Sequence, residues 1–330
     1  MKALVTGASG FIGSNLVREL LRHGYEVRAL LRKGSDTRNL DGLKLEMAYG
    51  DLRDPRSLEG AVAGCDVLFH AAACYTFWLP QPRLMYEINV KGTENILSAA
   101  MKKGIKRAVY TSTCSTIGIS TNGLPSNEET ELNPDDLVGH YKKSKYLAES
   151  VAWKFYHLGL PLVVVNPTTP VGAYDIKPTP TGKMIVDYLN RRMFAYVETG
   201  LNIVAVEDVA KGHILALERG RPGQRYLLGN QNLTLKEVFF ILEQISGIPA
   251  PRAKIPVWLA TGVAYIDELI EGGLLRRPPR IPVASVKMAR KFMFFDSSRA
   301  VRELGLPQTP VEQALERAVR WFTDNGYVKG

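Results

Sequence analysis

The segment GHYKKSKYLAES, residues 139–150, places a tyrosine four residues before a lysine. On a helix, positions i and i+4 share one face, so Tyr141 and Lys145 would project side by side. A phenol with a pKa of about 10 is a poor base near neutral pH, and a neighbouring ammonium lowers that pKa by stabilising the phenolate. The spacing therefore predicts an acid/base centre built on Tyr141 and Lys145.

A third polar group would be needed to orient a substrate oxygen beside this pair. The strand-like segment VYTSTCST offers Ser112 and Thr113, whose hydroxyl groups can both donate and accept hydrogen bonds. Either hydroxyl could instead only cap the strand end. The other long polar residues of the helix, Lys142, Lys143 and Glu149, are expected to form a solvated face.

The elements that must position these groups alternate between strands and helices. Helical patterns separate apolar, strand-like runs throughout the first half of the chain. Such an order implies right-handed crossovers and a parallel sheet that is covered on both faces. The expected fold class is α/β, with a Rossmann-type doubly wound parallel sheet. The expected strands are KALVT, YEVRALLR, LKLEMAYG, DVLFHAA, RAVYTST and PLVVVN.

A glycine-rich turn, TGASGFIG, joins the first expected strand to the first expected helix. Glycines at three-residue spacing allow a tight turn and a close backbone approach, so that a pyrophosphate can sit on the helix N-terminus. This context predicts a dinucleotide site, although a glycine turn can also be merely structural. The loop residues expected to bind the cofactor are Gly7, Ser9, Gly10, Phe11, Ile12 and Gly13.

The end of the second strand, LLRKGS, favours NADP over NAD. NAD-specific sites tend to carry an acidic residue here for the ribose hydroxyl, whereas this chain has Arg32 followed by Lys33. An arginine pairs with a 2′-phosphate through charge-assisted hydrogen bonds. A solvated arginine is the alternative, and NAD stays open as a cofactor.

Further cofactor contacts are expected where the later strands end. A carboxylate after the third strand can accept from the adenine amino group, small residues after the fourth strand let the cofactor lie against the backbone, and the helix lysine can hold the nicotinamide ribose. The residues concerned are Asp51, Leu52, Ala71, Ala72, Ala73, Lys145 and Pro167.

The motifs GASGFIG, GDL, HAAA, NVKGTEN, YTST, YKKSK and VEDVA occur in this order, and DSSRAVRELG stands near the C-terminus. This ordered set resembles the extended short-chain dehydrogenase/reductase family over nearly the whole chain. The resemblance implies an NADP-binding Rossmann domain over residues 1–170 and 200–220, and a smaller, mainly helical substrate-binding domain over 171–199 and 221–330. The strand and helix in NIVAVEDVAKGHILALERG would return to the main sheet.

The resemblance also implies hydride transfer between a nicotinamide and a carbonyl group or secondary alcohol. Tyr141 would be the acid/base, Lys145 its partner and Thr113 the hydroxyl of the catalytic set, with Ser112 in reserve.

Within this family, HYKKSKYLAE and NPTTPVGAYDIKPTPTGKMIVDYLN look like the branch called hopanoid-associated sugar epimerase, which is also similar to dihydroflavonol 4-reductases. Two observations favour a ketone or aldehyde reductase. Arg32 indicates NADPH, which is usually kept reduced, and Thr169 stands where nucleotide-sugar enzymes of the family often have asparagine. The alternative is a nucleotide-sugar epimerase or dehydratase linked to hopanoid biosynthesis.

A substrate cleft is expected beside the nicotinamide site. The aromatic residues Tyr75, Trp78 and Tyr174, together with Lys177, could line an apolar pocket that holds a few polar groups. The same aromatic residues could equally belong to the core. The helix IPVWLATGVAYIDELIEGGLL is expected to be buried in the smaller domain rather than to lie on a membrane.

Composition narrows the class of protein further. The net charge is +9, but the positive residues are scattered, and the densest group at 276–290 lacks the aromatic residues of a nucleic-acid surface. Cys65, Cys74 and Cys114 form no CxxC pair, and no histidine has a metal-ligand partner at a suitable spacing. We therefore expect a cytoplasmic enzyme that acts on a small molecule without a metal and does not bind nucleic acid; a homodimer is compatible with the sequence.

Overall fold

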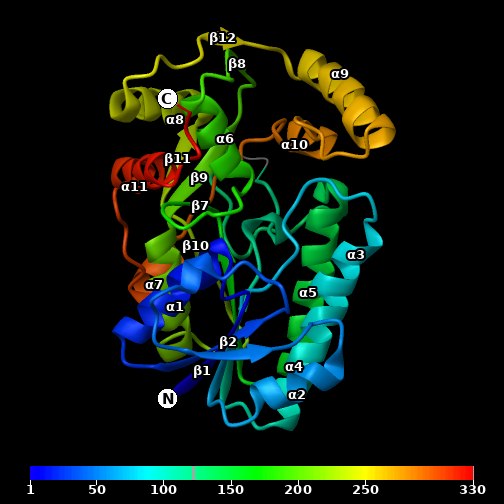
Figure 1. The fold of residues 1–330 in the computed structure, drawn as a ribbon, viewed down its shortest axis with the longest axis vertical. Coiled ribbons are helices and arrows are strands. Elements are labelled where there is room, and N and C mark those ends of the chain that lie inside the picture. The colour runs from blue at the N-terminus through cyan, green and yellow to red at the C-terminus, as the bar shows by residue number, and fades with distance from the viewer. Residues whose placement is uncertain (121–122, 330) are drawn as a thin grey trace.

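The computed structural model describes residues 1–120 and 123–329. Its centre is a seven-stranded sheet with the order β10-β6-β5-β4-β1-β2-β3, in which every neighbouring pair is parallel (Figure 1). The strands are β1 (Lys2–Thr6), β2 (Glu26–Leu31), β3 (Glu46–Tyr49), β4 (Val67–His70), β5 (Arg107–Thr111), β6 (Leu162–Pro167) and β10 (Arg225–Leu228).

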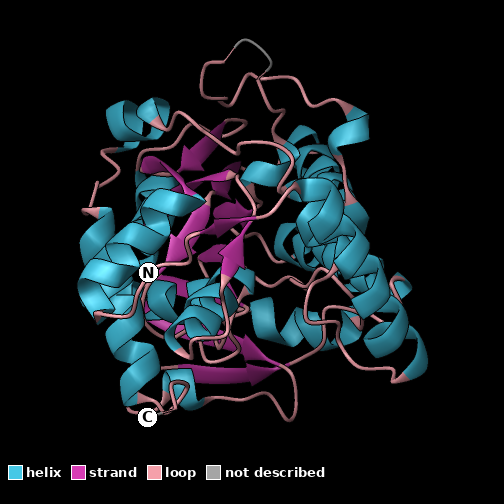
Figure 2. Cartoon of the chain, turned by 90° about the horizontal axis from the view of Figure 1, so that it is seen from above, coloured by secondary structure: helices cyan, strands magenta, loops and turns pink. Residues whose placement is uncertain are grey.

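Helices cover both faces of this sheet, as the view from above shows (Figure 2). One core lies under α1 and α7 and the other under α2, α4 and α5, with β4 and most of β6 buried between them. The alternation of apolar strands with helices thus produces the two cores that a doubly wound sheet requires. The helices are α1 (Phe11–Arg22), α2 (Pro55–Val62), α4 (Gly92–Lys102), α5 (Gly139–His157) and α7 (Val206–Glu218).

The strand order reverses between β1 and β4. From β1 the chain proceeds to β2 and β3 on one side, and from β4 to β5, β6 and finally β10 on the other. At the carboxyl end Thr6 pairs in register with His70, so the turns that begin at Gly7 and Ala71 leave the sheet side by side. Ligands of such sheets bind in the crevice at this point.

A third core lies above the carboxyl edge of the main sheet. It packs a three-stranded sheet of order β11-β9-β7 against three helices, with Tyr188, Phe239 and Phe322 buried between them. The elements are β7 (Thr169–Val171), α6 (Pro180–Leu189), β9 (Gly200–Ala205), β11 (Gln231–Thr234), α8 (Leu235–Ser246) and α11 (Val311–Asp324).

A separate arm extends from this third core at the top of the view in Figure 1, where α9 stands clear of the sheet. The arm consists of β8 (Ala195–Tyr196), paired with β12 (Ala253–Lys254), then α9 (Val257–Asp267), the π-helical turn η5 (Glu268–Leu274) and α10 (Val283–Met288). The remaining short helices are η1 (Arg38–Leu40), α3 (Arg83–Tyr86), η2 (Glu87–Lys91), η3 (Cys114–Thr116), η4 (Pro134–Asp136) and η6 (Ala300–Leu304).

The expected fold class is confirmed, but two strands lie elsewhere than expected. β9, in the segment expected to return to the main sheet, pairs with β7 and β11, and only the helix α7 packs on the main sheet. The seventh strand is instead β10, which falls within the range 221–330 expected for substrate binding. The sequence of an apolar strand does not show which sheet the strand joins, because its pairing partners depend on how the rest of the chain folds.

The helix α9 also differs from the expectation of burial. Trp258, Ile266 and Leu269 are 73%, 61% and 67% exposed. Within the described residues, no helix combines the length and the apolar character needed to span a membrane.

Candidate active site

The tyrosine of the opening motif lies near the N-terminus of α5, half-buried among aromatic rings. The ring of Tyr141 is 4.6 Å from that of Tyr75 and 6.3 Å from that of Phe77, measured between centroids. Burial raises the pKa of Tyr141, and a hydrogen bond with Thr113 acts in the opposite direction. The expected lowering of this pKa is therefore wrong for this structure, and the phenol is protonated at neutral pH.

The lysine one turn later is directed into the sheet. The Nζ of Lys145 donates to the hydroxyl of Tyr110, at 3.0 Å, and to the carbonyl oxygen of Thr111, at 2.8 Å. Burial lowers the pKa of Lys145 to about 7, and the charge of Glu149 opposes this change. The lysine is held firmly at the end of β5, and its charge depends on pH in the neutral range.

A chain of buried hydroxyl and imidazole groups connects this lysine with the glycine turn. Tyr110 is within hydrogen-bonding reach of Thr93, whose Oγ1 lies 3.0 Å from Nε2 of His70. The Nδ1 of His70 lies 2.7 Å from Oγ1 of Thr6, which accepts from the backbone N–H of Ala72 at 3.1 Å. Burial and then the charge of the lysine lower the pKa of His70 to about 3, so the ring is neutral.

The two hydroxyl candidates after β5 point to different partners. Thr113 is the extended residue before η3, and its Oγ1 accepts from the N–H of Ser115 at 3.3 Å while lying beside the phenol of Tyr141. Ser112 is buried and donates to Oε2 of Glu149. The geometry thus brings Thr113, rather than Ser112, to the tyrosine.

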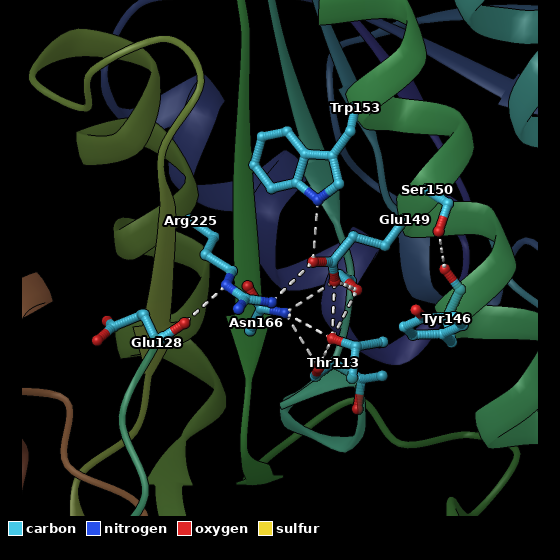
Figure 3. A network of polar contacts seen from close by, with 10 residues as sticks. Thr113, Glu128, Tyr146, Glu149, Ser150, Trp153, Asn166 and Arg225 are labelled. Carbon is cyan, nitrogen blue, oxygen red and sulfur yellow. Dashed lines mark hydrogen bonds and ion pairs between the residues drawn. The ribbon is translucent and has the colours of Figure 1, made fainter. Parts of the chain in front are cut away.

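Glu149 was expected to face solvent, and the structure contradicts this. Its carboxylate is buried at the centre of a polar network that we call the Glu149 cluster (Figure 3). Oε2 accepts from Ser112, from Thr116 at 2.7 Å and from Asn166 at 3.1 Å, while Oε1 accepts from Trp153 and pairs with Arg225, both at 3.3 Å.

The expectation for the other two polar residues of α5 is half right. Lys143 is exposed, but Lys142 is buried, and burial lowers its pKa. Lys142 lies near Cys114 of η3, Asp136 of η4 and Lys291, so it faces the segments that pack on the first turns of α5 and not the solvent. The spacing that pairs Tyr141 with Lys145 also places Glu149 on the same stripe of the helix, and this repeat could have predicted its burial.

The glycine turn fits a dinucleotide pyrophosphate. Gly7 has a φ of +69°, and a Cβ on it would lie 2.8 Å from the backbone of Ala72, while a Cβ on Gly13 would overlap the carbonyl oxygen of Gly7. In the described part of the chain, no side chain caps the start of α1, and its first turn holds no acidic residue. The free N–H groups of that turn are therefore open to an anion.

The remaining predicted cofactor residues lie along the same carboxyl edge, with differing surroundings. The carboxylate of Asp51 accepts from the side chain of Arg53 at 2.6 and 3.0 Å, which lowers its pKa, and the charge of Arg32 adds to this effect. Leu52 is buried against Gly92. Arg32 is exposed at the end of β2. The other members of the set are Ser9, Gly10, Phe11 and Ile12 in the turn, Ala71, Ala72 and Ala73 after β4, and Pro167 at the end of β6.

The four predicted cleft residues separate into two groups. Tyr75 stacks on Tyr141, and the indole of Trp78 lies against Gly272 of η5. Tyr174 instead covers the guanidinium of Arg18, whose Cζ lies 3.7 Å from the ring centre. Lys177 is near Asp36, on the nucleotide side of the molecule, where its charge contributes to a lowered Asp36 pKa.

Two functional positions were missed by the sequence analysis. Phe77 forms the second wall of the tyrosine site. Asn89 binds the loop after β4, because its Oδ1 accepts from the N–H of Cys74 at 2.7 Å and its Nδ2 donates to Ser144 of α5 at 2.9 Å. The motif NVKGTEN marks the asparagine, but nothing in the sequence connects it with Cys74.

A doubly wound sheet with a glycine turn at its switch point, and with a tyrosine and a lysine on an adjoining helix, defines a class of dinucleotide-dependent enzymes. The model of the NAD dependent epimerase/dehydratase family matches residues 3–229. The chain belongs to this family of enzymes, which confirms the resemblance to extended short-chain dehydrogenases/reductases.

Relatives extend over the whole length of the chain. A protein of Synechocystis sp., provisionally named dihydroflavonol 4-reductase, is 46% identical over 98% of this chain and 95% of its own. Sterol demethylase protein B of Methylococcus capsulatus is 37% identical over 99% and 100%. The crystal structure of gox2253 superposes with a TM-score of 0.89 at 42% identity, covering 99% of both chains.

Proposed function

We propose that this enzyme is an NADPH-dependent reductase of a ketone or aldehyde. The observation that carries the proposal is the place of Tyr141. Its phenol borders the Thr113 hydroxyl, lies on the helix face that also carries Lys145 and is flanked by the rings of Tyr75 and Phe77. A phenol in this place can donate a proton to the oxygen of a carbonyl compound held between the rings, as a reductase requires.

In this proposal the carbonyl carbon would receive a hydride from the bound cofactor. Tyr141 donates its proton to the carbonyl oxygen, so that a ketone becomes a secondary alcohol, and water returns the proton to the phenol. Thr113 donates a hydrogen bond to the same oxygen and orients it. Lys145 holds the nicotinamide ribose, and the glycine turn with the start of α1 holds the pyrophosphate.

The surroundings of Tyr141 support an apolar or aromatic carbonyl compound. Tyr75 and Phe77 present ring faces and edges to the phenol, and aromatic side chains of this kind form the walls of pockets for apolar ligands. The names of two relatives, a dihydroflavonol 4-reductase and a sterol demethylase protein, agree with a polycyclic substrate.

NADPH is proposed as the cofactor because Arg32 stands exposed at the end of β2, close to Asp51. Its guanidinium can pair with a 2′-phosphate. The second candidate function is epimerisation or dehydration of a nucleotide sugar, which the family model includes in its name. Thr169, the first residue of β7, holds the place where such enzymes often carry asparagine.

The test uses the purified enzyme and its Tyr141→Phe variant. We expect the wild type to consume NADPH with a flavanone-like or steroid ketone, and the variant to lose about a hundredfold to ten-thousandfold in kcat, because the proton donor is removed. NADPH binding should be unchanged, as measured by fluorescence titration. A variant that keeps most of its activity would overturn the role of Tyr141, and conversion of a nucleotide sugar without NADPH consumption would establish the second function.

A further inference from the structure

The arm carries a helix surface with its large apolar residues turned outward. Ala260 and Ala264 are buried against Val283 and Val286 of α10, so the inner side of α9 is made of small residues. An ordinary surface helix has the opposite arrangement, with its large apolar residues facing the core. We call the outer surface the α9 face; it consists of Trp258, Leu259, Val263, Tyr265, Ile266, Leu269, Ile270 and Leu274, which are 42–77% exposed.

The acidic residues of the arm are engaged with neighbouring parts of the chain. The carboxylate of Asp267 accepts from the N–H of Ile281 at 2.8 Å, and that of Glu268 from the N–H of Val283 at 3.0 Å. Glu271 of η5 pairs with Arg280 at 3.6 Å. Basic residues adjoin the α9 face: Arg276 and Arg277 follow it directly and are exposed, and the Nζ of Lys287 lies 5.4 Å from the ring centre of Tyr265.

We propose that the α9 face docks this enzyme on an anionic lipid bilayer. Helices that lie in the bilayer interface bury an apolar face that includes Trp or Tyr, and basic residues beside it attract anionic headgroups. A second copy of the chain is a poorer occupant, because a twofold contact through this face would bring the same arginines together. An exposed surface made of eight large apolar residues marks an interaction site.

The arm that carries the α9 face contacts the loop and the helix that surround Tyr141. The indole of Trp78 packs on Gly272 of η5. The loop after β4 that carries Trp78 also carries Tyr75, whose ring lies against that of Tyr141 at a tilt of 38°. The start of α5 also lies close to α10, since a Cβ on Gly139 would be 3.2 Å from Ala284. A bilayer in contact with the α9 face would thus lie next to the loop that borders Tyr141. The docking itself does not depend on which reaction the enzyme catalyses.

The test measures binding to vesicles of phosphatidylcholine alone and of equimolar phosphatidylcholine and phosphatidylglycerol, by co-sedimentation of the full chain. We expect binding to the anionic vesicles. The double variant Arg276→Glu/Arg277→Glu should lower the partition coefficient at least about tenfold, because each basic residue near the surface contributes to the attraction.

Two matched variants make the result specific. Arg56→Glu/Lys103→Glu changes the net charge equally but alters exposed residues around α2 and α4, at the opposite end of the molecule in Figure 1, and should bind like the wild type. Leu269→Ser/Leu274→Ser should lose binding while retaining NADPH affinity and thermal stability. Failure of the wild type to bind, or equal binding by all variants, would overturn the proposal. A concentration-dependent dimer that only Leu269→Ser/Leu274→Ser dissociates would instead assign the face to self-association.

Discussion

The tyrosine and the lysine of the candidate site are both shifted by burial toward their neutral forms. Burial raises the pKa of Tyr141 and lowers that of Lys145 to about 7. Sequence spacing alone suggested a charged lysine that acidifies the phenol. The structure instead supplies a proton donor next to a lysine that is bonded to Tyr110 and Thr111. Desolvation by itself makes the phenol a weaker acid, so the acid role proposed for Tyr141 is argued from its place beside Thr113 and not from this shift of its pKa.

The two neighbouring hydroxyl residues should respond differently to substitution. Thr113→Val keeps the shape of the side chain but removes the hydroxyl beside Tyr141, so we expect kcat to fall about a hundredfold. The same hydroxyl accepts from the N–H of Ser115 at the start of η3, and its loss should lower the free energy of unfolding by about 0.5–2 kcal/mol. Ser112→Ala removes a donor to Glu149 and should lower the free energy of unfolding by about 1–3 kcal/mol while changing kcat less. Steady-state kinetics and urea unfolding of both variants check this. The reverse pattern would make Ser112 the catalytic hydroxyl.

Cofactor choice is the second prediction at the scale of one residue. Arg32→Asp should weaken NADPH binding about tenfold to a hundredfold, the value of a lost charge-assisted contact, and should strengthen NADH binding through the ribose hydroxyl. Dissociation constants for both cofactors measure the effect. Arg56→Asp, an exposed arginine on α2, is the matched control and should leave both constants unchanged. Equal affinities for the two cofactors before and after the Arg32 change would refute the NADPH assignment.

The helix α5 connects the residues proposed to be catalytic with three strands through a single stripe of side chains. Tyr141, Lys145 and Glu149 follow one another at four-residue intervals, and the last of them accepts from Asn166 on β6 and pairs with Arg225 on β10 (Figure 3). Its bonds to the turn after β5 fix the segment that carries Thr113. Asn166 and Thr116 of the cluster also donate to the carbonyl oxygen of Thr113, at 3.0 and 2.8 Å, so the cluster holds the backbone of the residue whose hydroxyl we propose to be catalytic.

Glu149→Gln should be destabilising and should also alter the active site. The amide places a donor among donor groups and leaves Arg225 without its anion, which we expect to cost about 3–5 kcal/mol of unfolding free energy. Because the charge of Glu149 raises the pKa of Lys145, its removal should move the lysine titration to lower pH.

Urea unfolding and a 15N-detected titration of Lys145 measure the two effects. Glu316→Gln, in an exposed pair with Arg320, is the control and should change stability by less than about 1 kcal/mol. A Glu149→Gln protein as stable as this control would show that the cluster contributes little.

The sequence predicted the elements of the main sheet well because each of them carries a local pattern. Apolar runs bounded by turns gave β1 to β6, and the glycine turn gave the start of α1. The same local rules brought Thr113 beside Tyr141, because a strand end and a helix face are properties of short segments. The catalytic roles of Thr113, Tyr141 and Lys145 stay predictions.

The features that were not predicted depend on packing between distant segments. Burial of Glu149 requires Asn166 and Arg225, which lie 17 and 76 positions away. The choice of β10 over β9 as the seventh strand depends on which edge of β6 is free. The exposure of α9 depends on an alanine pair that satisfies the inner contact while larger residues point outward. Periodicity shows that a helix has an apolar side, but it does not show which side of the helix the rest of the fold covers.

At the scale of the whole molecule, the buried lysine connects the stability of the fold with pH. Lys145 is 2% exposed and is directed from α5 toward the sheet, where the negative charge of Glu149 favours its ammonium form. Its ammonium is costly in this place, and the chain tolerates it because two oxygen acceptors hold it. Below neutral pH the folded chain therefore bears the cost of burying the Lys145 ammonium. Above neutral pH the folded chain releases the proton and this cost disappears.

The free energy of unfolding should rise with pH above 7 because of this residue. The folded-state pKa of Lys145 is about 7 and the ordinary value is 10.5, so between these values the unfolded chain holds a proton that the folded chain has released. Unfolding then takes up a proton, and stability increases by up to about 1.4 kcal/mol per pH unit. Below pH 7 both states hold the proton and the residue contributes no slope.

Urea unfolding of the wild type and of Lys145→Met, carried out in steps from pH 7.5 to pH 9.5, isolates this contribution because the other titrating groups are common to both proteins. His70 is neutral in both states over this range and does not interfere. We expect the free energy of unfolding of the wild type, minus that of Lys145→Met, to increase as the pH rises. The hydrogen bonds lost in the variant add only a constant to this difference. Lys103→Met, which alters an exposed lysine, should follow the wild type throughout. Parallel curves for the wild type and Lys145→Met would mean that the lysine keeps its proton in the folded enzyme, and its partner oxygens would then stabilise the ammonium more strongly than burial destabilises it.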